Sequence, residues 1–265
     1  MQPTRRAFLA AAAAAALGAC TGPDPTPSDR TSGAATAPTS PAGPAPAATP
    51  RPPAPARARG PARAVFSGPR TGRQVALTFH GSGDPALVRQ LLDVAAQAGA
   101  PISVFVVGRW LEAHPDLAGR ILAGGHELDN HTYTHPVLGQ VPRPGVAAEI
   151  RRCRDVLTWL TGSGGRYFRP SGMTAPTPMV LAEAGAAGYP LVVGFDVDPH
   201  DYADPGADAI ATRVTAALRA GSIVSLHTGH AGTVAALPRI LTALRTRGLQ
   251  PVTLRDLLRG GPSAP

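Results

Sequence analysis

Four of the eight histidines stand at or just past the end of a segment that has the character of a strand. The four are His80, His131, His135 and His227. Histidines scattered through a core would not be expected to gather at strand ends. In parallel α/β folds, the residues that follow the strands meet at one end of the sheet. The pattern therefore predicts one site that contains several imidazoles.

Two of these histidines have the spacing of a metal-binding pair. His131 and His135 stand four residues apart in NHTYTHP, and residues with this spacing share one face of a helical turn. Paired imidazoles are suitable ligands for Zn²⁺ or a similar divalent ion. We therefore expect a divalent metal cofactor, with zinc preferred. The alternative for such a pair is a surface turn that binds nothing.

His227 and Asp201 have the chemistry of an acid and its partner. His227 ends the apolar run at 222–226, so we expect one side of its ring in the core and the other in a pocket. A hydrogen bond to Asp201 would favour the protonated imidazole and fix its tautomer. Two simpler interpretations stay open: His227 bonded to a nearby carbonyl, and Asp201 as a turn residue in DPHDY.

Strand-like and helix-like segments alternate from residue 64 to about residue 260. Strand-like segments lie at 74–79, 102–107, 127–130, 166–168, 191–195, 222–226 and 251–254. Helical apolar spacing predicts helices at 86–98, 114–123, 146–161, 178–187, 207–220 and 234–247, with a short one at 255–259. This alternation predicts an α/β fold, a parallel sheet with outer helices, arranged as a barrel that need not be complete. On the 146–161 helix, Cys153 falls on the apolar face, so we expect it to pack in a core.

The start of the chain has the composition of an export signal. Residues 1–19 combine Arg5 and Arg6 with an apolar run that is too short to span a bilayer, as in a signal peptide with a twin-arginine motif. The sequence LGAC at 17–20 resembles a lipobox, in which Cys20 would carry lipid. We therefore expect an extracytoplasmic protein that is lipid-anchored to a bacterial cell membrane through Cys20.

A tether follows the expected anchor. Residues 21–63 contain no Val, Ile, Leu, Met or aromatic residue, so they cannot form an apolar core. We expect a disordered Pro/Ala-rich tether over 20–63, a folded domain over 64–260 and a short tail over 261–265.

The net charge of +8 does not describe a nucleic-acid-binding domain. Residues 1–63 carry seven Arg and two Asp, a net +5, whereas residues 64–265 carry 18 Arg and 15 acidic residues, a net +3. The folded part therefore lacks a strong positive balance. We expect no nucleic-acid partner, and we expect a monomer.

Five short motifs resemble, in order, those of the NodB-like polysaccharide deacetylases, carbohydrate esterase family four. They are TFH at 78–80, NHTYTH at 130–135, YFRPSG at 167–172, DVDPHDY at 196–202 and SLH at 225–227. The resemblance covers about residues 73–257 and implies a distorted (β/α)7 barrel. It also implies the removal of acetyl groups from N- or O-acetylated sugars, usually with a divalent metal.

The resemblance assigns roles to five residues. His131 and His135 match the family's metal-binding histidines, and Arg169 matches the arginine that holds the catalytic base. Asp201 matches the aspartate that tunes the catalytic acid, and His227 matches that acid.

The first motif departs from the family pattern TFDDG. In the family the first Asp is the general base and the second binds the metal, but His80 and Gly81 stand at these positions. The arginine motif also differs, with PSG at 170–172 where Pro-Pro-Tyr is usual. If a loop N–H helps to bind the oxyanion, as in the family, Gly172 still supplies one.

Two arrangements could replace the missing carboxylates. In the first, His80 joins His131 and His135 as a third ligand, and Asp84 or Asp198 is the base. In the second, His80 is the base and the glycine-rich loop at 81–83 brings Asp84 to the metal.

The resemblance implies a hydrolase whose substrate is an acetylated wall glycan. A non-catalytic glycan-binding pseudoenzyme on the same barrel is the main alternative, because both first-motif carboxylates are missing. A metal-dependent hydrolase of other amides or esters is a third.

Overall fold

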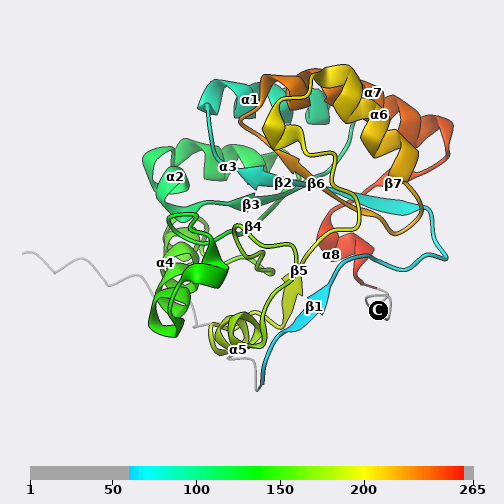
Figure 1. Ribbon diagram of the computed structural model, residues 1–265. Coiled ribbons are helices and arrows are strands. Elements are labelled where there is room, and N and C mark those ends of the chain that lie inside the picture. The colour runs from blue at the N-terminus through cyan, green and yellow to red at the C-terminus, as the bar shows by residue number, and fades with distance from the viewer. Residues whose placement is uncertain (1–59, 260–265) are drawn as a thin grey trace, which may run out of the picture. The chain divides into compact units, whose positions relative to one another are not determined.

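The computed structural model describes residues 60–259 (Figure 1). The expected signal peptide, Cys20 and most of the expected tether lie outside the described residues, as does the tail after residue 259. The fold already includes residues just before 64: Ala62 N donates to Leu181 O, and the strand β1 is Arg63–Val65. Among residues 60–259, no helix has the length and hydropathy that a membrane crossing needs.

Parallel strands form the centre of the domain. Their order is β4 (Glu127–Asn130), β3 (Ser103–Val106), β2 (Gln74–Gly81) and β6 (Ile223–His227), and β7 (Gln250–Pro251) pairs with the start of β2. His80 pairs with Phe105 on one side and His227 on the other. The strand therefore continues two residues beyond Phe79, where the sequence suggested a turn.

A second, two-stranded sheet completes the barrel. It pairs β1 with β5 (Leu191–Val193), again in parallel. Single bridges join it to the larger sheet, from Asn130 through Phe168 to Val192 on one side and between Val197 and Val224 on the other. The strands and bridges, together with the short stretch of chain between Val193 and Val197, thus close a ring, and the predicted distorted barrel is confirmed.

The strand expected at 166–168 is reduced to the bridges at Phe168. The cause is Asp129, whose Oδ1 accepts hydrogen bonds from the N–H groups of Arg166 at 2.8 Å and Tyr167 at 2.9 Å. The carboxylate of Asp129 therefore binds the main-chain N–H groups that a longer strand at 166–168 would donate to a neighbouring strand.

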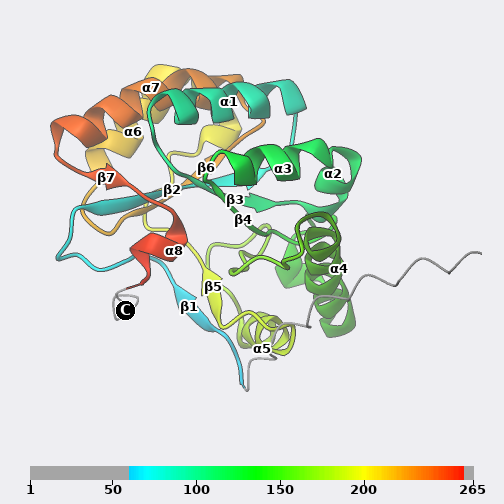
Figure 2. The same cartoon turned by 180° about the vertical axis from the view of Figure 1, so that it is seen from behind.

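Helices surround the barrel (Figures 1 and 2). They are α1 (Pro85–Gln97), α2 (Gly108–Ala113), α3 (Asp116–Ala123), α4 (Arg143–Thr161), α5 (Pro178–Ala186), α6 (Ala207–Ala217), α7 (Ala231–Thr246) and α8 (Leu254–Leu257), with 3-10 turns η1 (Leu138–Gln140) and η2 (Asp201–Ala203). In both views α1, α7 and α6 lie along one side of the sheet, and α4 packs beside α5. Cys153 is fully buried on α4, as its spacing predicted.

Candidate active site

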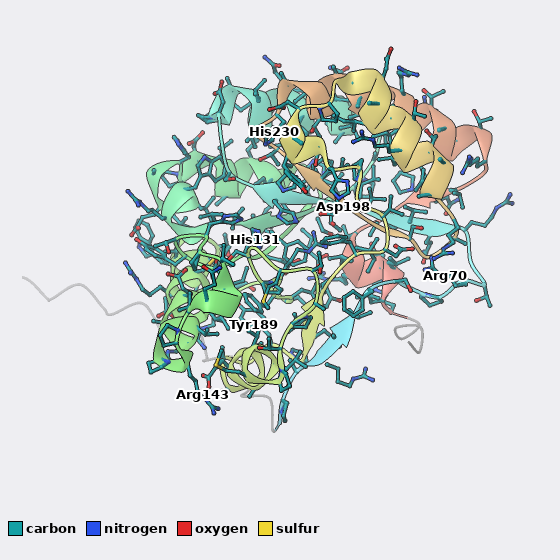
Figure 3. The ribbon with its side chains drawn as sticks, in the orientation of Figure 1. Arg70, His131, Arg143, Tyr189, Asp198 and His230 are labelled. Atoms are coloured by element: carbon teal, nitrogen blue, oxygen red, sulfur yellow. The ribbon has the colours of Figure 1, made fainter. Side chains whose placement is uncertain are left out.

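The strands bring three imidazoles, two at strand ends and one in the following loop, to one end of the barrel. His80 and His227 are register partners on β2 and β6, and His131 directly follows β4. The ring centre of His80 lies 4.3 Å from that of His131 and 4.4 Å from that of His227. The site therefore lies at the carboxyl ends of the strands, where barrels of this kind place their chemistry (Figure 3).

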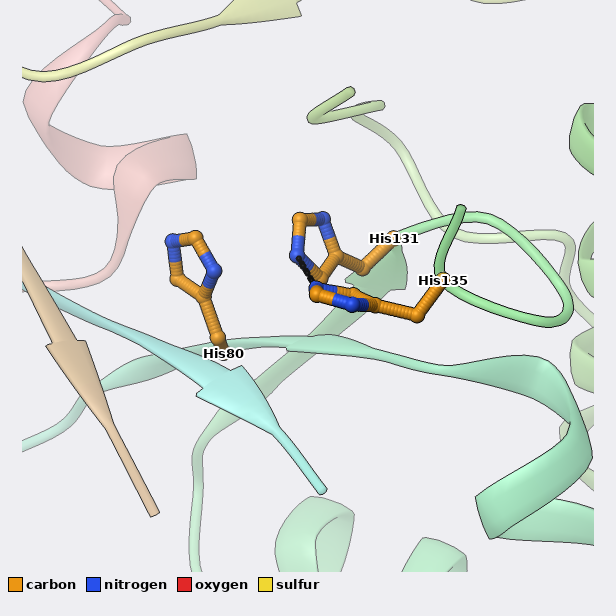
Figure 4. Close-up of side chains that lie close together, drawn as sticks. All are labelled: His80, His131 and His135. Atoms are coloured by element: carbon orange, nitrogen blue, oxygen red, sulfur yellow. Dashed lines mark hydrogen bonds between the residues drawn. The ribbon is translucent and has the colours of Figure 1, made fainter. Parts of the chain in front are cut away.

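His131 and His135 meet through their outer ring nitrogens. The two Nε2 atoms are 3.2 Å apart (Figure 4). His131 is fully buried, and its Nδ1 lies 2.9 Å from Arg169 O. Because a carbonyl can only accept, Nδ1 carries the proton and Nε2 keeps its lone pair for a metal.

The segment between these two histidines is not the helical turn that their spacing suggested. Thr132 and His135 have positive φ values of 69° and 64°. The loop is held from α4, where the carboxylate of Glu149 accepts from Tyr133 N, Thr134 N and the Thr134 hydroxyl, each at 2.8 Å. The pair converges because of this distant carboxylate, which local spacing could not reveal.

His80 completes a group of three possible metal ligands. One nitrogen from each of His80, His131 and His135 lies within 4.8 Å of the others, and Figure 4 shows the His80 ring beside the pair. Nε2 of His80 lies 3.1 Å from the Ser225 hydroxyl, which leaves Nδ1 as the nitrogen for an ion. Ser225 was not identified from the sequence, although its two-residue spacing from His227 places both on one strand face.

The structure does not bring Asp84 into this group. Its side chain caps helix α1 by accepting from Ala86 N at 2.8 Å, and the residue is exposed. A side chain at Gly81 would not reach the group either. A Cβ there would lie 2.8 Å from Val104 Cγ1 and 2.9 Å from Val106 Cγ1, both in the core. The geometry therefore favours the first of the two arrangements, with His80 as the third ligand.

The surroundings keep these imidazoles neutral. Burial is the main cause that holds the pKa values of His80 and His131 well below the ordinary value, and neighbouring histidines and Arg169 add to it. Burial also lowers the pKa of His135, followed by the charge of His227. Neutral imidazole is the form that binds metal.

The donor set fits a divalent ion such as zinc. Two ligands on one tetrahedral zinc ion, each about 2.0–2.1 Å from it, lie about 3.3 Å apart. The 3.2 Å between the Nε2 atoms of His131 and His135 agrees with this separation. His80 needs only a small movement, since its nitrogen already lies within 4.8 Å of theirs.

Asp201 and His227 form a buried carboxylate–imidazole pair. Asp201 Oδ1 lies 2.7 Å from His227 Nδ1, and Oδ2 accepts from His227 N at 2.7 Å and from the Thr233 hydroxyl at 2.6 Å. Asp201 is fully buried, whereas 21% of the His227 side chain is exposed. The carboxylate therefore fixes Nδ1–H, and Nε2 of His227 has no hydrogen-bond partner within residues 60–259.

Arg169 is 1% exposed, and its charge acts on the imidazoles of His80 and His131. Its Nε and Nη2 donate to Val193 O and Gly194 O at 3.0 and 3.1 Å, but Nη1 has no partner within residues 60–259. Burial lowers its pKa to about 9, opposed by the charges of Asp129 and Asp198. A guanidinium with a buried, unpartnered NH₂ nitrogen can hold a carboxylate or an anionic reaction intermediate.

Asp198 is a second carboxylate whose charge acts on Arg169, after that of Asp129. The bridge between Val197 and Val224 sets Asp198 beside Ser225, the partner of His80. Its side chain is 23% exposed, and its Oδ1 accepts from His200 N at 2.9 Å. The neighbouring Asp196 has a different role, because it binds Arg70 and the N–H of Ile223 away from the imidazoles.

Residues with strained backbone gather in the loops of this site. Within the described part of the chain, the non-glycine residues with positive φ are Thr132, His135, His200 and Asp204. The first two belong to the loop after β4, and the other two flank η2, which carries Asp201. Such residues commonly collect where function fixes the geometry.

Comparison with known proteins places these features in a family. Residues 67–192 match the family model described as polysaccharide deacetylase. The chitooligosaccharide deacetylase of Sinorhizobium fredii is 35% identical over 198 residues, which cover 68% of this chain and 91% of that protein.

Two solved structures have the same fold. A peptidoglycan N-acetylglucosamine deacetylase superposes with a TM-score of 0.68 at 29% identity, covering 73% of this chain and 92% of that one. A pseudoenzyme of carbohydrate esterase family four from Bacillus anthracis gives 0.70 at 22% identity, covering 76% and 70%, and bears on the fold alone. With its barrel, its imidazole cluster and these relatives, the chain belongs to the polysaccharide deacetylase family of hydrolases.

Proposed function

We propose that this protein is a metal-dependent deacetylase of an N-acetylated cell-wall glycan, anchored outside the cytoplasm by lipid on Cys20. The observation that carries the proposal is the arrangement of His80, His131 and His135 beside the Asp201–His227 pair. A glycan-binding module would need neither a neutral imidazole cluster nor an oriented acid. The relatives named for chitooligosaccharide and peptidoglycan deacetylation support an N-acetyl substrate.

The three imidazoles would hold the metal, and zinc fits them best. When bound, a divalent ion supplies Lewis acidity toward the acetyl carbonyl and makes water a stronger acid. His131 is oriented for this role by its bond to Arg169 O, and His80 by its contact with Ser225.

The protein supplies the proton transfers. We assign Asp198 as the base that takes the proton of the attacking water, because it lies beside Ser225 and its charge acts on Arg169, whereas Asp84 is an exposed helix cap outside the imidazole group. His227 Nε2 gives a proton to the leaving amine, while Asp201 holds Nδ1–H. The Gly172 N–H would help to bind the oxyanion. No residue in the described range accepts a hydrogen bond from this N–H. The products are acetate and a free amino sugar.

Acetate release tests the proposal. The full chain is incubated with N-acetylglucosamine oligomers and with peptidoglycan, before and after chelation and then with each divalent ion added back. We expect release that chelation abolishes and zinc restores. Asp198→Asn should lower kcat by at least about a hundredfold, and Asp93→Asn, which breaks an exposed ion pair with Arg120, is the control. Absence of release with every ion tested would favour the pseudoenzyme.

Metal titration separates the two arrangements of the first motif. His80→Ala should weaken metal binding sharply, whereas Asp84→Ala should not. The opposite result would support the second arrangement, in which Asp84 binds the metal and His80 is the base.

The anchor requires its own test, since Cys20 lies outside the described residues. Cys20→Ala should move the protein from the membrane fraction to the soluble extracytoplasmic fraction. Retention of this variant in the membrane would contradict lipid anchoring.

A further inference from the structure

A second carboxylate–imidazole pair lies next to the first. Asp204 Oδ1 is 2.8 Å from His230 Nδ1, and the ring of His230 is 5.8 Å from that of His227 at an angle of 77°. Both members stand three residues after their counterparts, Asp201 and His227. The same two loops therefore present two such pairs side by side at the mouth of the site.

The second pair differs from the first in its exposure. The side chains of His230 and Asp204 are 27% and 68% exposed, whereas Asp201 is fully buried. His230 also begins helix α7 without capping it through its side chain. The imidazole of His230 therefore does not cap the helix, as the side chain before a helix often does.

The pair leaves one polar atom of His230 available. Nδ1 is engaged by Asp204, and no residue within 60–259 bonds to Nε2. An imidazole fixed in this way can accept a hydrogen bond at Nε2 when neutral and donate one when protonated. A hydroxyl group can match either state, because it both donates and accepts.

We propose that His230, oriented by Asp204, forms a binding site for a hydroxyl group of the sugar that carries the leaving amine. The inference rests on the proposed function, in which His227 faces that amine. Hydroxyls of the same sugar ring lie a few bonds from the nitrogen, and the ring of His230 lies 5.8 Å from that of His227, close enough for both to meet one sugar.

A competing explanation is that the pair is only a tie between loops. Asp204 ends η2, and His230 begins α7, so their bond could steady Asp201 against His227. A tie would act on every substrate through His227, whereas a hydroxyl site would act only on substrates that bear the sugar. Substrate choice therefore separates the two explanations.

The experiment compares an N-acetylglucosamine oligomer with an aryl acetate ester, which has the acetyl group but no sugar. Full-length wild type, His230→Ala, His230→Gln and Asp204→Asn are assayed with zinc, and Asp93→Asn is the matched control. We expect His230→Ala to raise KM for the oligomer about tenfold with little change in kcat, and to leave ester hydrolysis within about twofold. Asp204→Asn should have a smaller effect in the same direction.

Oligomer binding by calorimetry and thermal unfolding complete the design. Oligomer affinity should fall in His230→Ala while Tm stays close to that of wild type. Equal losses on both substrates with a lower Tm would show a tie, and unchanged KM and affinity would also overturn the proposal. If wild type releases no acetate, the proposed function fails, and the loss of oligomer affinity in His230→Ala still decides the binding site.

Discussion

Replacing Asp201 by Asn tests the chemistry and the structure of the site together. Asp201 accepts three hydrogen bonds, from His227 Nδ1, His227 N and Thr233 Oγ1, at 2.7, 2.7 and 2.6 Å. Asn has nearly the same shape but only one accepting oxygen. If that oxygen faces Nδ1, the amide NH₂ meets the His227 N–H, which cannot turn away. If it faces the main chain, the NH₂ meets Nδ1 and forces the other tautomer.

The magnitude follows from this conflict. A hydrogen bond to a charged group contributes about 1.5–3 kcal/mol, and a buried donor left without a partner costs about 1–3 kcal/mol. We therefore expect the free energy of unfolding of Asp201→Asn to fall by about 2–4 kcal/mol. His227 also loses its anionic partner, and the same change in a Ser-His-Asp triad lowers kcat about 10⁴-fold. We expect a loss on the order of 10³–10⁴-fold here.

Two assays check this prediction: kcat on the acetylated oligomer and urea unfolding monitored by circular dichroism. Thr233→Val is the matched control, because it removes the third bond and leaves both His227 contacts in place. It should lower stability by about 1–2 kcal/mol and keep kcat within about tenfold. A folded Asp201→Asn that retains more than a tenth of wild-type kcat would refute the assignment of this pair as the acid.

Three further predictions concern stability and reactivity. The lowered pKa values of buried His131 and His80 mean that, below pH 6.5, the unfolded state binds protons that the folded state does not. Each of the two imidazoles should lower the stability of metal-free protein by about 1.4 kcal/mol per pH unit, and His131→Asn should reduce the combined slope in urea unfolding at pH 7 and pH 5. Asp84→Ala should lower stability by about 1 kcal/mol through loss of the α1 cap, and Asp84→Ser should recover most of it; equal stability of all three proteins would contradict the capping role. Burial raises the pKa of Cys153 to about 12, so an aromatic disulfide reagent should label this thiol only after unfolding, and rapid labelling of native protein would show that α4 opens.

The sequence predicted the main strands and helices because each depends on local apolar spacing. β4 has the predicted bounds, and α4 differs only at its start. β1 was missed because its three residues, RAV, carry no strand pattern of their own and become a strand only by pairing with β5. Asp129 shortened the strand expected at 166–168, an effect that requires a buried side chain from another strand.

The sequence identified the residues of the site more readily than the contacts that position them. His131, His135 and His227 were marked by their positions at strand ends, and Asp201 by the family motif. The role of Asp84 as a helix cap was available from its place before Pro85, at the start of a helical pattern. The Ser225 contact and the Glu149 clamp depend on residues that are far apart in sequence, so spacing alone could not predict them.

The left-handed residues around the site have a thermodynamic consequence. Each non-glycine residue in this conformation costs about 1–3 kcal/mol, and four of them occur in two loops. Glycine at these positions would remove the steric cost but would also widen the range of shapes that each loop can adopt. The protein thus accepts a lower global stability in return for loops that are set before a glycan arrives, and we expect them to move little when one binds.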